Sequence, residues 1–183
     1  HGTEIYRAGA FGEAILVWSE IYRELGPERG YRVAFSLARA YEKLGDATRA
    51  AEHYESYLDE LRKRREAGDT VDALLVKQEE QANESIVELR TKLGQIRFRG
   101  AEVLVVIDAD VPRVGRNVAY VTAGKHAIKF RPSTVDERRV EVVVVAGQVV
   151  DVETPAIEAA PMPVSVAPPP APAIRWETRE EPP

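Results

Sequence analysis

The chain changes its periodicity abruptly near residue 96. Residues 1–96 repeat apolar side chains at helical spacing and are rich in Ala, Leu, Glu and Arg, with few β-branched residues. Residues 97–154 instead alternate valine with polar residues, as in "AEVLVVID" and "RRVEVVVV". A run of helices followed by a run of strands predicts an α+β fold, here with a helical domain over 1–96 and a β domain over 97–154.

The last residues, 155–183, contain nine of the chain's twelve prolines. Proline lacks a backbone donor and favours extended polyproline II structure. This segment therefore predicts a Pro-rich linker without a core of its own.

Composition excludes several classes of function. The net charge of −5 argues against nucleic-acid binding, which needs a concentrated excess of Lys and Arg. The chain has no cysteine, so disulfides and thiolate chemistry are excluded. No apolar run is long enough to span a membrane, and the chain begins without methionine or a signal-peptide pattern. We expect an excised fragment, with any membrane anchor encoded outside it.

The first 64 residues contain an internal repeat. The segments "AGAFGEAILVWSEIYREL" and "LGDATRAAEHYESYLDEL" align with an offset of 36 residues, from Ala14 to Ala50. In each copy a small residue precedes an aromatic one by four positions, which places both on one helix face. A second apolar stripe between the copies ends at Gly45, a predicted helix C-cap; it comprises Ala34, Leu37, Ala38 and Tyr41. The pattern predicts helical hairpins stacked in a short solenoid.

Residues 31–64 resemble the tetratricopeptide repeat, whose pattern is matched by Leu37-Ala38, Tyr41, Gly45-Asp46, Ala50 and Tyr54. Residues 9–27 are similar to the second helix of a preceding repeat. The resemblance implies a concave face that binds a partner, an extended peptide terminus or an acidic segment, through Arg32, Phe35, Arg39, Glu42 and Lys43. The alternative, that these are ordinary solvated helix residues, stays open.

A long helix is predicted over residues 69–93, with Asp69 or Thr70 as its N-cap. It carries an apolar stripe of Leu75, Ala82, Leu89 and Ile96, flanked by Val71, Ile86 and Leu93. We expect this stripe to pack on the preceding hairpin and to cap the solenoid. A coiled-coil dimer is the alternative.

Five strands are predicted in the β domain, over residues 96–107, 117–121, 126–131, 139–145 and 149–153. Turn residues such as Gly, Pro and Asp separate them. Short strands with tight connections predict an antiparallel sheet or a small β-sandwich.

The strand region resembles a PEGA domain. The resemblance rests on "RGAEV", on Asp108 at a strand end, on "VTAGKHAIKF" and on "VVVVAGQVVDVE", which resembles the family's closing hairpin. The chain departs from the family at Asp108-Ala109-Asp110, which replaces an Asp-Gly turn, and at Ala123, which replaces a proline. The resemblance implies a location in the periplasm or cell envelope of a bacterium, with membrane attachment only through a segment outside this chain.

His126 is predicted to be a hairpin residue that follows a turn at Gly124, because no second histidine lies near it in sequence. Asp108-Ala109-Asp110 could hold calcium, although we expect turn chemistry there. Searches for nucleotide-binding, hydrolase and metalloprotease motifs find none. We therefore predict no enzymatic activity, no cofactor and no metal.

These observations together predict a non-enzymatic interaction or scaffold protein that binds a protein or peptide partner through its helices. Two alternatives stay open. The strand region could be a carbohydrate or cell-wall binding module, or the chain could be the extracytoplasmic sensory part of a membrane signalling protein.

Overall fold

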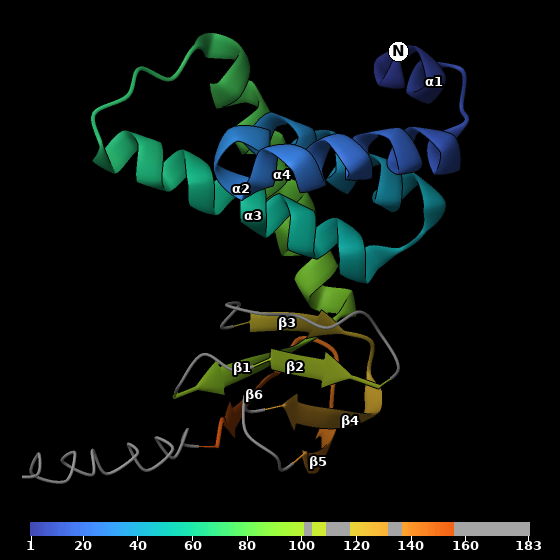
Figure 1. Cartoon of the computed structure of the whole chain (residues 1–183), viewed down its shortest axis with the longest axis vertical. Coiled ribbons are helices and arrows are strands. Elements are labelled where there is room, and N and C mark those ends of the chain that lie inside the picture. Colours follow the sequence, from blue (N-terminus) through green and yellow to red (C-terminus); the bar gives the residue numbers. More distant parts are fainter. Residues whose placement is uncertain (101–103, 109–117, 132–136, 156–183) are drawn as a thin grey trace, which may run out of the picture.

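A computed structural model describes residues 1–100, 104–108, 118–131 and 137–155. Four helices precede six strands, which confirms the predicted α+β class. In Figure 1 the helices lie together at one end of the molecule and the strands at the other, with α1 well away from the strands. Most of the predicted Pro-rich linker and Asp110 lie outside the described residues.

The first two helices are α1, Gly2–Arg7, and α2, Phe11–Leu44. A kink divides α2 at Gly26, whose φ of 70° and ψ of 173° are not helical. Pro27 follows directly, and proline cannot donate the backbone hydrogen bond that a continuous helix needs. The helix ends at Gly45, which has a φ of 79° and takes the predicted C-cap position.

The next two helices are α3, Ala47–Glu66, and α4, Ala73–Lys92. Their N-cap residues are Asp46 and Asp72, and each carboxylate accepts a hydrogen bond from the backbone three residues later. The prediction of Asp69 or Thr70 as the cap of α4 was therefore wrong. Asp72 is the N-cap because its Oδ1 atom accepts a hydrogen bond from the Leu75 N–H, with a distance of 2.8 Å between oxygen and nitrogen.

The apolar stripe of α4 packs into a core with α2 and α3, as predicted. Its buried members are Leu75, Ala82, Ile86 and Leu89, and they join Ala34, Phe35, Ala38, Ala50, Tyr54 and Tyr57. Ile96 does not belong to this stripe, because the helix ends before it and the chain continues as a strand.

The strands are β1, Gly94–Arg99; β2, Leu104–Ile107; β3, Val118–Val121; β4, Gly124–Arg131; β5, Arg138–Val144; and β6, Val149–Glu153. They form two three-stranded sheets, in the orders β3-β1-β6 and β2-β4-β5. Side chains from all six strands share one buried core, which includes Ile96, Ile128 and Phe130. Alternation along each strand supplies this core, since successive side chains point to opposite faces.

Three features of the predicted β region differ from the structure. The strand predicted over 96–107 is two strands, β1 and β2, in different sheets, and Gly100 ends the first with a φ of 115°. The β1 and β6 strands pair in parallel, so the arrangement is not purely antiparallel. The predicted hairpins at Gly124 and Gly147 are instead crossings between sheets, because β3 and β4, like β5 and β6, belong to different sheets.

Candidate functional site

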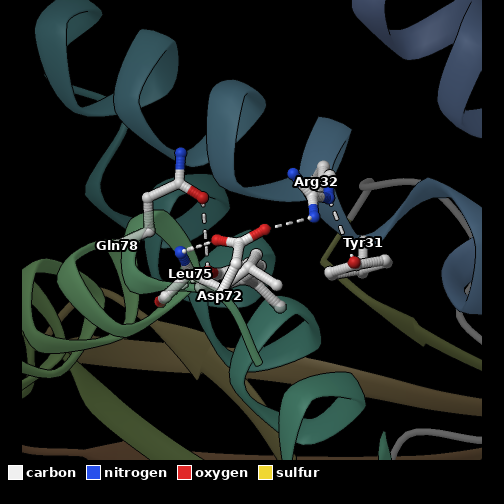
Figure 2. A network of polar contacts seen from close by, with 6 residues as sticks. Tyr31, Arg32, Asp72, Leu75 and Gln78 are labelled. Carbon is white, nitrogen blue, oxygen red and sulfur yellow. Dashed lines mark hydrogen bonds and ion pairs between the residues drawn. The ribbon is translucent and has the colours of Figure 1, made fainter. Parts of the chain in front are cut away.

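The predicted partner-binding face of α2 is largely in contact with the rest of the chain. Arg32 lies 3.2 Å from Asp72, the N-cap of α4, and also donates to the Tyr31 hydroxyl at 3.0 Å. Figure 2 shows this network, in which Asp72 accepts from both Arg32 and the Leu75 N–H. The pKa of Asp72 is lowered, first by the Leu75 backbone hydrogen bond and then by Arg32.

The other predicted residues differ in accessibility. Phe35 is 3% exposed and belongs to the helical core. Glu42 accepts a hydrogen bond from the Tyr54 hydroxyl at 2.7 Å and lies 3.5 Å from Ser85 of α4. The Arg39 guanidinium lies over the rings of Tyr6 and Phe35, at 5.4 and 6.0 Å from their centroids. Lys43 is exposed.

Helix α4 thus covers part of this face. It contacts Arg32 near its N-terminus and Glu42 near its middle. The structure does not offer the five residues as one open groove, because Phe35 is buried and two of the charged residues already have partners within the chain. Their role in partner binding stays a prediction.

A second candidate lies where the helices meet the strands. Tyr120 of β3 is 1% exposed, and its ring belongs to the helical core. Its hydroxyl donates to Glu55 of α3 and accepts from the Nε atom of Arg90 of α4 at 3.1 Å. Arg90 also forms an ion pair with Glu55 at 2.6 Å. Burial, followed by the hydrogen bond to Glu55, raises the pKa of Tyr120 far above its ordinary value, so the hydroxyl stays protonated.

Beside this junction is a hollow of about 310 Å³. Helix α3 supplies one side of it through the first turn and its cap, and the strands supply the other. The lining residues are Asp46, Thr48 and Arg49 from the helical side, and Ile107, Asp108, Tyr120, Val121, Thr122 and His126 from the strand side.

His126 is held firmly at the edge of this hollow. Its Nδ1 atom lies 2.9 Å from Asp108 Oδ2, and its Nε2 atom lies 2.8 Å from the backbone oxygen of Thr122. The two contacts fix the orientation of the imidazole ring between Asp108 and Thr122. His126 was predicted to be a hairpin residue, and this is wrong, because β3 and β4 belong to different sheets and the residues between them form a crossing.

Asp108 is fixed by three contacts. Besides His126, its Oδ1 atom accepts from the Ala127 N–H at 2.9 Å, and its own N–H donates to the Ala127 oxygen at 2.7 Å. These contacts maintain a backbone φ of 54°, which is unusual for a residue other than glycine. Partial burial works to raise the pKa of Asp108, but the Ala127 amide and the His126 ring outweigh it and lower this pKa.

The charges that line the hollow are paired locally. Asp46 lies 3.5 Å from the Arg49 guanidinium, and Asp108 lies beside His126. The helical side therefore presents a guanidinium and the strand side presents a half-exposed carboxylate, and Thr48 and Thr122 also line the hollow. Such a surface can hydrogen-bond to both the carbonyl and the N–H groups of a ligand.

Sequence reasoning placed Asp46, Asp108, Tyr120 and His126 in turns, strands or the core, but did not bring them together. The helical and strand residues of the hollow are about 60 to 80 positions apart in sequence, and no local spacing encodes that proximity. The residue types gave one usable signal, a tyrosine in a valine-rich strand. A buried tyrosine needs a hydrogen-bond partner for its hydroxyl, and none is supplied by the neighbouring valines.

Among the described residues, no group of three or more His, Cys, Asp or Glu side chains could hold a metal ion. Within the same residues, no helix is both long and apolar enough to cross a membrane. Comparisons of the chain with protein-family models, with curated proteins and with solved structures found no match.

Proposed function

We propose that this chain is a non-enzymatic interaction module of a bacterial cell-envelope protein, in which TPR-like helices and a PEGA-like β-sandwich together hold a peptide segment of a protein partner. The envelope location rests on the PEGA resemblance of the strand region. The single observation that carries the binding proposal is the hollow at the junction of α3 with the strands, which both parts of the molecule line.

The chemistry of the hollow suits a peptide. Arg49 can donate to a carbonyl or carboxylate oxygen, and Asp108 can accept from a backbone N–H. The volume of about 310 Å³ gives room for one or two side chains of a partner, at the small end of the range for ligand sites. Because the lining charges are paired within the chain, the partner needs little net charge at this point.

This proposal moves the binding site away from the α2 face. Contacts with α4 already engage Arg32 and Glu42, whereas the hollow opens between the two parts of the chain. The same junction supports the proposed scaffold role, since the hydroxyl of Tyr120 links the strands to Glu55 and Arg90 of the helices. A partner bound at the junction would contact both parts at once.

The test is affinity capture from solubilised bacterial envelope, followed by binding measurements with the purified partner. The informative variant is Thr48→Arg, which fills the hollow from a half-buried position in the first turn of α3. Thr3→Arg is the matched control, since Thr3 is an exposed helix residue in α1, at the far end of the molecule (Figure 1). We expect at least a tenfold loss of affinity for Thr48→Arg and none for Thr3→Arg.

A further variant, Arg39→Ala with Lys43→Ala, separates this proposal from binding on the α2 face. If that variant loses the partner and Thr48→Arg keeps it, the site lies on α2 and the proposed hollow is wrong. Recovery of polysaccharide alone by the unaltered chain would overturn the protein-partner proposal in favour of a carbohydrate module.

A further inference from the structure

Strand β5, Arg138–Val144, lies at the edge of its sheet. The order of that sheet is β2-β4-β5, and in the described part of the chain no strand pairs with the far side of β5. An edge strand presents backbone N–H and C=O groups at every second residue, and these can pair with a strand of another chain. Seven residues of β5 are extended, long enough for such pairing.

The side chains of β5 do not obstruct this edge. On the outer face, Arg139, Glu141 and Val143 are 59%, 72% and 64% exposed. On the inner face, Val140 and Val142 pack against the β core but remain only partly buried. The strand contains no proline, and no charged side chain lies among its buried ones, so two common protections of an edge are missing here.

We propose that the β5 edge is the interface of a homodimer, in which β5 pairs antiparallel with β5 of a second copy about a two-fold axis at Val140. In this register Val140 lies opposite Val140 of the second copy, and Arg139 lies opposite Glu141. The two sheets join into one continuous six-stranded sheet, and the partly buried valines of both inner faces gain cover.

Charge complementarity selects this register. If the inner faces of both sheets are to lie on the same side of the joined sheet, the two-fold axis must pass through a residue of β5. The axis can therefore move along the strand only in steps of one residue. Moving the axis to Glu141 places two glutamates opposite each other, and moving it to Arg139 places two arginines opposite each other. Directly opposed like charges destabilise a strand pair, whereas opposite charges stabilise it. The axis at Val140 is flanked by two Arg-Glu pairs.

The charges on the neighbouring strand, β4, also favour the proposed register. In the β4–β5 register, Lys129 lies directly opposite Arg139, so Arg139 has a like charge beside it within its own sheet. Its ion pair is with Glu141 on the same strand at 3.3 Å, and Lys129 pairs with Glu137 at 3.1 Å. Glu141 of a second copy would place a carboxylate on the open side of Arg139. The interface uses none of the residues that line the junction hollow.

The test is sedimentation velocity of the whole chain over a concentration range, with charge variants in β5. We expect a reversible dimer that dissociates in the micromolar range, because a single edge pairing is smaller than a standard interface. Arg139→Glu and Glu141→Arg each place like charges across the axis and should weaken the dimer at least tenfold. Glu153→Arg in β6 changes the net charge as Glu141→Arg does and should leave the dimer intact.

Two recovery experiments keep the proposal falsifiable if one variant is poorly folded. An equimolar mixture of the two single variants restores Arg opposite Glu and should give a heterodimer, and the double variant Arg139→Glu with Glu141→Arg should restore the homodimer. A monomeric chain at high concentration overturns the proposal. A dimer whose dissociation constant is unchanged by both charge variants also overturns the proposal, since its interface then lies elsewhere.

Discussion

Tyr120 connects the two parts of the molecule through both its ring and its hydroxyl group. The ring lies in the helical core although the residue belongs to β3. The hydroxyl donates to Glu55 and accepts from Arg90, so it links a strand to two helices. The hydroxyl thus gives both Glu55 and Arg90 a hydrogen-bond partner in a partly buried site, where a missing partner would cost free energy.

Replacing Tyr120 with Phe should therefore destabilise the chain by about 1–2 kcal/mol, because the ring is kept but the Glu55 and Arg90 groups lose a hydrogen-bond partner. The free energy of unfolding, measured by urea denaturation, checks this. Tyr31→Phe is the control: its hydroxyl contacts Arg32 at an exposed position, so we expect a change within about 0.5 kcal/mol. Equal losses in the two variants would contradict the proposed role of the Tyr120 hydroxyl.

Asp108 should make the stability of the fold depend on pH. Its pKa is lowered in the folded chain, so its carboxylate stabilises the fold fully above the unfolded pKa of about 4. That contribution is lost as the pH falls through the folded pKa. Asp108→Asn removes the titrating group and keeps an acceptor for the Ala127 N–H. We expect wild type to be more stable than this variant at about pH 5.5 and the gap to shrink at about pH 3.

Urea denaturation midpoints of both proteins across this pH range measure the gap. A gap of the same size at both ends would mean that the carboxylate charge of Asp108 contributes nothing to the fold.

At the scale of elements, the sequence predicted local structure better than pairing. The C-cap at Gly45 and the α4 stripe of Leu75, Ala82 and Leu89 were predicted because helical contacts are local. The split of the first strand and the parallel β1–β6 pair were missed. Alternation identifies a strand and its buried face, but it does not say which sheet the strand joins.

The same limit applies to the candidate site. The residues of the hollow come from two parts of the chain, and their side chains meet because tertiary packing, in which Tyr120 takes part, joins these parts. The predicted partner-binding residues do lie on a helix, α2, but the sequence did not reveal that Asp72 and Ser85 would contact two of them, Arg32 and Glu42.

At Gly94 the first strand approaches the end of β5 closely. Gly94 begins β1 two residues after α4 ends, and a Cβ atom there would lie 2.0 Å from Cγ1 of Val144 and 2.9 Å from the backbone oxygen of Val145. Gly94→Ala should destabilise the fold by about 1–3 kcal/mol or more, because backbone as well as side chain must move. Thermal unfolding measures the change.

Gly12→Ala is the matched control for this prediction. Gly12 lies in α2, and nothing lies within 4 Å of a Cβ atom added there. Alanine favours a helix over glycine by about 1 kcal/mol, so we expect this variant to be as stable as wild type or more stable. Similar losses at both positions would mean that the close approach at Gly94 does not exist in solution.

For the whole molecule, the packing joins the helical part and the strand part into one body. Figure 1 places β3 as the strand nearest the helices, and β3 contacts α3 through Tyr120. The chain also passes from α4 into β1 with only Leu93 between them, and Leu93 is buried in the helical core. Neither part can move away from the other without exposing Tyr120 and breaking the hydrogen bonds of its hydroxyl group with Glu55 and Arg90.

This arrangement predicts cooperative unfolding of both parts in the wild-type chain. Helix content, followed by far-UV circular dichroism, and the valine methyl NMR signals of the strands should change at the same urea concentration. Tyr120→Ala removes a buried aromatic side chain, at a cost of about 3–5 kcal/mol. It also removes the contacts that Tyr120 makes between the strands and the helices, so the two signals should change at different urea concentrations. Tyr120→Phe keeps the ring in the helical core and should keep one transition. Two transitions in wild type would show that the helical and strand parts unfold independently. One shared transition in Tyr120→Ala would show that contacts other than those of Tyr120 couple them.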